Sequence, residues 1–183
     1  MEKNIRTEEK WSDKHESYMK HLITICKNKS SQHEKAGYLF KSKNTKWGLS
    51  VVLLPTIMSP ISILLESNEE VSKYTNACGF LATGVIGGIY SFFKFGEKMT
   101  NHFNFSARYT DIISDIELEL VKSRDFRVQL DVFSTRIHMS VDNLSNTEPV
   151  IPKNILEDKK YLISDYKYKP EHNIDIDLYN DNI

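Results

Sequence analysis

The sequence is poor in the residues that form disulfides and metal sites. Its two cysteines, Cys26 and Cys78, lie on opposite sides of a long apolar run, so we expect no disulfide between them. None of the six histidines has the close spacing of a metal-binding helix, and we predict no metal and no cofactor. Because most of these histidines stand among polar residues of predicted helices, we expect them to be solvated. They are His15, His21, His33, His102, His138 and His172.

Catalytic and phosphate-binding patterns are also missing. Glu117 and Glu119 are two residues apart and point to different sides of a helix, which is a poor arrangement for acid–base catalysis. The glycines of residues 84–88 lie within an apolar run and lack the lysine and hydroxyl that hold phosphate and Mg²⁺. A formal net charge of −1 gives no bulk electrostatic case for nucleic acid. We predict a protein that is not an enzyme and does not bind nucleic acid.

Two long runs contain no charged residue at all. Residues 47–65 and residues 74–93 are free of charge, and a short polar segment, residues 66–73, separates them. A bilayer core needs about 20 apolar residues of helix to cross it, and backbone in lipid is satisfied only as helix or closed barrel. We predict two transmembrane helices, 47–65 and 74–93, joined as a hairpin. The alternative is a buried helical hairpin in a soluble core.

Charges beside the two runs predict the orientation of the hairpin. Lys41, Lys43 and Lys46 precede the first run, and Lys94 and Lys98 follow the second, whereas the connecting segment carries three glutamates and one lysine. Positive flanks favour the cytoplasmic side of a membrane. We predict an integral two-pass protein with both termini cytoplasmic. The pattern leaves open which membrane receives it: a host membrane, a bacterial inner membrane or the internal membrane of a virion.

Residues within the two runs predict how the helices pack. Pro55 and Pro60 each remove a backbone donor, which favours a kink in the first span, either as a plain structural bend or as a gating hinge. The second span has a strip of small residues, where another helix can approach closely. That helix is either the first span or a second protomer, in the latter case around a pore. The strip consists of Gly79, Thr83, Gly84, Gly87, Gly88 and Ser91.

The chain outside the spans predicts amphipathic helices. Residues 5–27 form one, with a break at residues 28–31 and a capping box at Ser31–Glu34 that starts a second helix leading into the first span. Heptad-like seams follow the second span, and their partner is either the N-terminal helix or another copy of the chain. The second seam contains Phe126, Leu130, Phe133, Ile137, Val141 and Leu144.

The predicted fold is an all-α membrane protein in which a transmembrane hairpin joins a cytoplasmic helical bundle. Its parts are residues 1–46 and 94–152, which form the bundle, residues 47–93, which form the hairpin, and an extended tail, residues 153–183. The prolines of residues 149–152 end the helices. Residues 173–178 alternate apolar and acidic side chains with a strand period, which predicts either a docking peptide for a scaffold or capsid protein or a disordered acidic end.

One stretch resembles a known family. Residues 103–109, Phe-Asn-Phe-Ser-Ala-Arg-Tyr, with Ile112, Glu119, Leu120 and Arg124 after them, are similar to the post-membrane part of the SLATT superfamily of small two-span membrane proteins. The order of elements over residues 8–152 is similar too. The resemblance implies a membrane effector of the pore-forming kind, as inferred for nucleotide-triggered prokaryotic defence systems. It extends to two-span proteins of eukaryotes and large DNA viruses, and the Asn-, Lys- and Ile-rich composition suits an AT-rich genome.

Two functional hypotheses follow. The first is a non-enzymatic, homo-oligomeric, SLATT-like protein that perturbs or permeates the lipid bilayer. The second is a structural anchor, for example a viral protein that links the internal membrane of a large DNA virus to its capsid through the tail. The sequence favours the first and leaves the trigger, the number of copies and the conduction of ions open.

Overall fold

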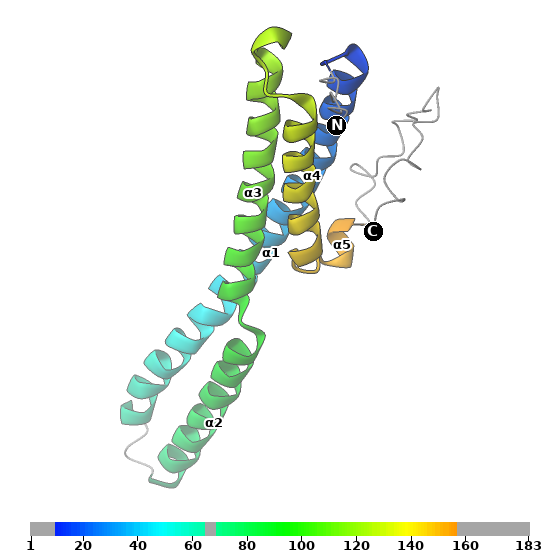
Figure 1. Ribbon diagram of the computed structural model, residues 1–183. Coiled ribbons are helices and arrows are strands. Elements are labelled where there is room, and N and C mark those ends of the chain that lie inside the picture. Colours follow the sequence, from blue (N-terminus) through cyan, green and yellow to red (C-terminus); the bar gives the residue numbers. More distant parts are fainter. Residues whose placement is uncertain (1–9, 65–68, 157–183) are drawn as a thin grey trace.

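The computed structural model describes residues 10–64 and 69–156, and this part of the chain is helical, with no strand (Figure 1). The predicted all-α class is confirmed. The elements are α1 (Asp13–Leu64), α2 (Glu69–Phe93), α3 (Phe95–Val121), the 3-10 helix η1 (Arg124–Phe126), α4 (Leu130–Thr147) and α5 (Lys153–Leu156).

Helix α1 is a single helix of 52 residues that passes from the bundle into a protruding arm. Ser12 begins it: its hydroxyl accepts the backbone N–H of His15 at 3.5 Å, and its own N–H donates to His15 Nδ1 at 3.2 Å. The predicted break at residues 28–31 and the capping box after it are wrong. Ser30 packs on α3 instead, where its hydroxyl donates to the Ser106 carbonyl at 3.0 Å, and this packing overrides the weak local preference of serine for a cap.

The bundle is formed by the first half of α1 together with α3 and α4 (Figure 1). Four residues of the second predicted seam lie buried in its core, and a fifth, Val141, packs against it. The seam is therefore filled within the chain. The core consists of Trp11, Met19, Leu22, Ile23, Cys26, Tyr109, Ile112, Ile113, Ile116, Leu130, Phe133, Ile137 and Leu144.

Phe126 corrects the predicted seam. Its side chain is 82% exposed, because the helix breaks between Val121 and Leu130 and Phe126 falls in η1 rather than on α4. The break is held in place by Glu119, whose carboxylate accepts the backbone N–H of Val128 at 2.5 Å, and by Trp11, whose indole N–H donates to the Val128 carbonyl at 2.9 Å. The predicted helical region 94–152 is therefore two helices joined by an anchored turn.

The second half of α1 and α2 form the arm, in which they lie antiparallel and side by side (Figure 1). Glycines bring the two helices close: Gly48 lies against the Tyr90 ring, and a Cβ at Gly79 would stand 2.9 Å from the Met58 Cε. The arm points away from the bundle. Lys94, the only non-glycine residue with positive φ in the described part of the chain (φ 48°), separates α2 from α3.

Helix α4 ends at Thr147, just before the first proline of residues 149–152. The chain does not then stay extended as predicted, because residues 153–156 form the short helix α5. Ile151 and Ile155 pack on Ala36 of α1, and this apolar contact holds the turn of helix against the bundle. The predicted docking segment, residues 173–178, lies outside the described residues.

Candidate functional site

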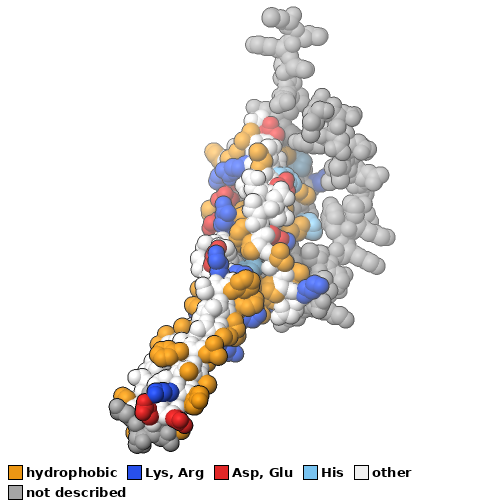
Figure 2. Space-filling view, turned by 90° about the horizontal axis from the view of Figure 1, so that it is seen from below, with side chains coloured by type: hydrophobic (Ala, Val, Ile, Leu, Met, Phe, Trp, Pro, Cys, Tyr) orange, Lys and Arg blue, Asp and Glu red, His pale blue; other side chains and the backbone are white. Residues whose placement is uncertain are grey.

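The arm has an apolar surface that no other part of the described chain covers. Figure 2 shows hydrophobic side chains along the arm, with charges confined to its tip and its base. Phe80 is 79% exposed, although phenylalanine is among the residues most often buried in proteins. An exposed apolar surface of this kind marks an interaction with a membrane or a partner. It includes Leu49, Val52, Leu53, Ile57, Ile63, Leu64, Leu81, Val85, Phe92 and Phe93.

One described stretch, Glu69–Val121, contains a helix long and apolar enough to span a membrane. The second predicted span, residues 74–93, lies in this stretch. Only 11% of its apolar window is buried, whereas the core helix of a soluble protein would be mostly buried. The alternative of a hairpin hidden in a soluble core does not fit this exposure. The first predicted span, residues 47–65, extends beyond the described residues at its end.

The predicted strip of small residues is divided between two faces of α2. Gly79 and Thr83 lie toward α1, and together with Pro55 and Met58 they line a shallow pocket of about 460 Å³. No atom lies within 4 Å of a Cβ built at the other three glycines of the strip, and Ser91 is exposed as well. The three glycines with open space before them are Gly84, Gly87 and Gly88.

Pro55 and Pro60 both lie inside α1, which remains helical through them to Leu64. Neither proline ends the helix. The predicted kink at these positions stays a prediction.

A second group of functional interest is buried where α1, α3 and the end of α4 meet. His33 of α1 and His102 of α3 face each other, with their Nδ1 atoms 3.0 Å apart. His33 Nε2 lies 3.2 Å from Glu148 Oε2, and that oxygen also accepts the Tyr109 hydroxyl at 2.9 Å. The other carboxylate oxygen accepts Lys29 Nζ at 2.5 Å. These five residues form one connected network, which we call the histidine network.

The geometry of the histidine network assigns its protons. Burial alone would raise the pKa of Glu148, but the hydrogen bonds from Lys29, His33 and Tyr109 hold it below 4.5, so the carboxylate is ionised and accepts. His33 therefore carries its proton on Nε2, and its Nδ1 accepts the Nδ1–H of His102. Burial lowers the pKa of both histidines below 6.5, and for His33 it outweighs the hydrogen bond that this ring donates to Glu148. Both rings are neutral at pH 7.

The prediction that most histidines are solvated is wrong for His33 and His102, which are 0% and 2% exposed. A signal for their burial was present in the sequence. His33 continues the three–four spacing of Met19, Leu22 and Cys26, and His102 lies in phase with the core face of α3. A histidine at a core position of a heptad needs buried partners, whereas its polar sequence neighbours are no guide to its environment.

The histidine network predicts that acid destabilises the bundle. Because the folded pKa of His33 and of His102 lies below 6.5, the unfolded chain takes up protons first, and stability is lost as the pH falls below about 6.5. The pKa of Glu148 is also lowered, so its contribution is present above pH 4.5 and is lost as the pH falls further. We expect the melting temperature in detergent to be constant from pH 8 to 7 and to fall from pH 6.5 to 5. Replacing both histidines by glutamine should flatten that fall, and an unchanged slope would contradict the assignment.

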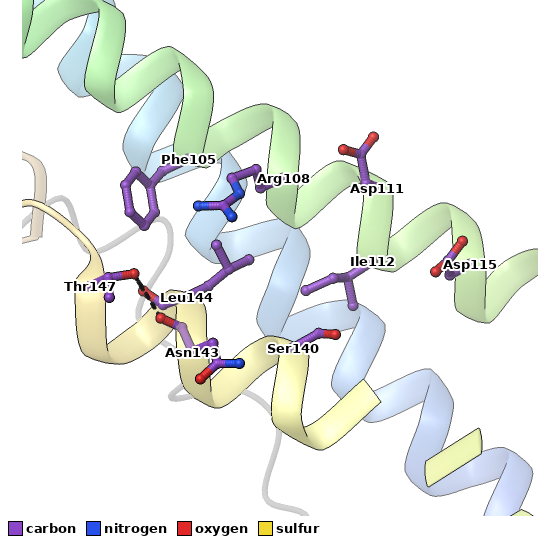
Figure 3. Close-up of a pocket in the computed structure, with 9 residues that line it drawn as sticks. All are labelled: Phe105, Arg108, Asp111, Ile112, Asp115, Ser140, Asn143, Leu144 and Thr147. Carbon is purple, nitrogen blue, oxygen red and sulfur yellow. Dashed lines mark hydrogen bonds between the residues drawn. The ribbon is translucent and has the colours of Figure 1, made fainter. Parts of the chain in front are cut away.

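A solvent-open cleft of about 690 Å³ lies between α3 and α4 (Figure 3). Ile112 and Leu144 are buried and form its apolar floor, while Arg108, Asp111 and Asn143 are exposed around it. The cleft places charges of both signs beside a small apolar surface. This arrangement suits a polar peptide or a small polar molecule.

Catalytic and metal chemistry gain no support from the described residues. Within residues 10–64 and 69–156, no group of three or more His, Cys, Asp or Glu side chains could hold a metal ion. Glu117 is exposed and pairs with Lys27, whereas Glu119 is buried in the last turn of α3 and holds the backbone of Val128. Cys26 is fully buried, and burial raises the pKa of its thiol to about 11. Comparison of the chain with models of known families, with curated proteins and with solved structures finds no match.

Proposed function

We propose that the chain is a two-pass membrane protein whose arm crosses the bilayer as a helical hairpin, with the bundle on the cytoplasmic side. The observation that carries the proposal is the uncovered apolar surface of the arm. Exposure of this apolar surface to water is unfavourable, whereas its exposure to lipid chains is not.

The dimensions of the arm support the proposal. Residues 74–93 of α2 are free of charge and, at 1.5 Å per residue, are about 30 Å long, which is the thickness of a bilayer core. Glu69, Glu70 and Lys73 lie at the tip, where headgroups or water would meet them. Lysines gather at the base, and a positive base favours the cytoplasmic side.

We propose further that the protein acts by self-association in the membrane, as a SLATT-like, non-enzymatic protein that perturbs or permeates the bilayer. The bundle seam is filled within the chain, whereas the arm leaves a continuous apolar surface uncovered by the described residues. Gly84, Gly87 and Gly88 leave open space on a face of α2 that α1 does not use. Small residues on such a face let a helix of another protomer approach closely.

Bulky substitutions on the open glycine face test self-association. We expect Gly84→Leu with Gly88→Leu to abolish crosslinked oligomers in membranes and the conductance of the purified protein in planar bilayers, because leucine keeps the second helix away. Ala82→Leu places one leucine at an exposed position on the other flank of α2 and should change neither. Crosslinking of the double variant at the wild-type level would show that this face is not the interface.

A structural anchor is the second candidate function, and the open cleft between α3 and α4 favours it. A partner such as a scaffold or capsid protein could contact the cleft while the arm holds the chain in a membrane. A silent monomer in planar bilayers would favour the anchor. Deleting residues 171–183 would then show whether the tail takes part in recruiting that partner.

A further inference from the structure

The base of the arm has an unusual concentration of lysines on two helices. Lys41, Lys43 and Lys46 lie on α1, Lys94 lies at the junction of α2 and α3, and Lys98 lies in the first turn of α3. All five are exposed. We call them the lysine collar. We propose that the lysine collar binds the phosphate of an anionic phospholipid at the cytoplasmic face of the membrane, an inference that rests on the proposed insertion of the arm.

Two lysines of the collar converge on one aromatic ring. Lys43 Nζ lies 5.7 Å from the centroid of Phe40, and Lys98 Nζ lies 5.9 Å from the same centroid. Lys98 also lies 5.9 Å from the Phe93 ring at the end of α2. Both ammonium groups therefore lie around one ring, and an anion bound near that ring would be attracted by both.

The collar contains almost no negative charge to balance it. From residue 35 to 65 and from residue 74 to 110, Glu97 is the only acidic residue, and it pairs with Lys94 at 3.4 Å. Within the described chain the other four collar lysines form no ion pair, whereas Lys27, Lys29 and Lys122 of the bundle each pair with a glutamate. The charge of the collar is therefore available to an external anion.

The backbone at the collar is fixed by close contacts between the helices. The Tyr90 hydroxyl donates to Asn44 Oδ1 at 3.1 Å, and Gly96 lies so close to that side chain that a Cβ there would stand 3.2 Å from the same oxygen. Phe93 and Phe95 stack with their centroids 5.4 Å apart across the left-handed residue Lys94. The two sets of lysines are thus attached to one rigid junction.

The position of the collar decides which anion it meets. It lies next to Trp47 and Tyr90, where the charge-free parts of α1 and α2 begin and end, and such aromatic residues lie at the headgroup level of a membrane. Each lysine near an anionic leaflet strengthens binding several-fold. A lipid phosphate is held at this level, whereas a free phosphate in solution is not.

The test measures lipid selectivity in reconstituted vesicles. The full chain is placed in phosphatidylcholine vesicles that contain spin-labelled phosphatidylglycerol or spin-labelled phosphatidylcholine, and the ratio of their association constants at the protein is measured. We expect the wild type to prefer phosphatidylglycerol, and Lys43→Gln with Lys98→Gln to lower that preference about fivefold or more. Lys14→Gln with Lys20→Gln removes the same charge from exposed lysines at the far end of the bundle and should leave the preference unchanged.

The outcomes separate this proposal from the proposed function. Equal association of both lipids with an inserted wild-type chain would overturn the collar and leave membrane insertion standing. A chain that fails to insert into any of the vesicles would overturn both. Loss of the preference on addition of millimolar inorganic phosphate, at constant ionic strength, would assign the collar to a soluble phosphate and overturn the lipid site.

Discussion

Placing an arginine at Ile57 and another at Val85 is expected to remove the chain from the membrane fraction. Both side chains are exposed near the middle of the two proposed spans. One arginine at the centre of a transmembrane helix raises the free energy of membrane insertion by about 2.5–3.5 kcal/mol. With one arginine in each span, both spans keep little net preference for lipid. Carbonate extraction of membranes from expressing cells measures the result.

The matched control places the same two arginines on the bundle. Leu118 of α3 and Val132 of α4 are also exposed hydrophobic residues, so their replacement changes charge and apolar area in the same way. Leu118→Arg with Val132→Arg should leave the chain in the membrane pellet. If the arm variant pelleted as well as this control, the arm would not be the membrane-binding part.

Removing the partly buried carboxylate of the histidine network should destabilise the bundle. Glu148→Ala leaves Lys29 without its counter-ion and leaves His33 and Tyr109 without their acceptor. Breaking a fully buried pair by deleting one partner costs about 3–5 kcal/mol. Because the side chains of Lys29 and Glu148 are 33% and 17% exposed, we expect a loss near the lower end of that range. We expect a large drop in the free energy of unfolding, measured by circular dichroism in one detergent.

Glu117→Ala provides the comparison for that substitution. Glu117 also pairs with a lysine of α1, Lys27 at 3.0 Å, but both side chains are more than half exposed. A surface pair contributes at most about 1 kcal/mol, so this variant should unfold almost as the wild type does. Equal losses in the two variants would mean that the histidine network adds nothing to an ordinary surface ion pair.

The helical class and the arm could be predicted from the sequence because they depend on local composition. The absence of charge over residues 74–93 is visible in the sequence alone. The glutamates and lysines beside this stretch are visible there too, and their interpretation does not depend on tertiary contacts. The break predicted at residues 28–31 failed for a different reason. Ser30 and Ser31 favour a cap only when nothing competes, and in α1 the contact of Ser30 with Ser106 of α3 does compete.

The contacts within the bundle depend on pairings that no local pattern contains. Glu148 lies 115 residues from His33, and no spacing rule connects them. Periodicity found Leu130, Phe133 and Ile137, yet it counted Phe126 with them, because a regular apolar spacing does not reveal that the helix has broken. The spacing of the glycines predicted the strip on α2. Which of them face α1 depends on how α2 is rotated about its own axis against α1: Gly79 faces Met58, whereas Gly84 faces open space.

Both self-association in the membrane and lipid binding by the lysine collar require that the arm crosses the membrane. Cysteine labelling measures this most directly. With Cys26 and Cys78 replaced by alanine, a single cysteine is placed at Glu70, near the tip, or at Thr135, on the exposed side of α4. An impermeant maleimide is applied to sealed vesicles of each orientation. We expect Thr135→Cys to be labelled only from the cytoplasmic side and Glu70→Cys only from the opposite side. Labelling of both positions from the same side would contradict it, because the arm would then lie on the membrane and not cross it.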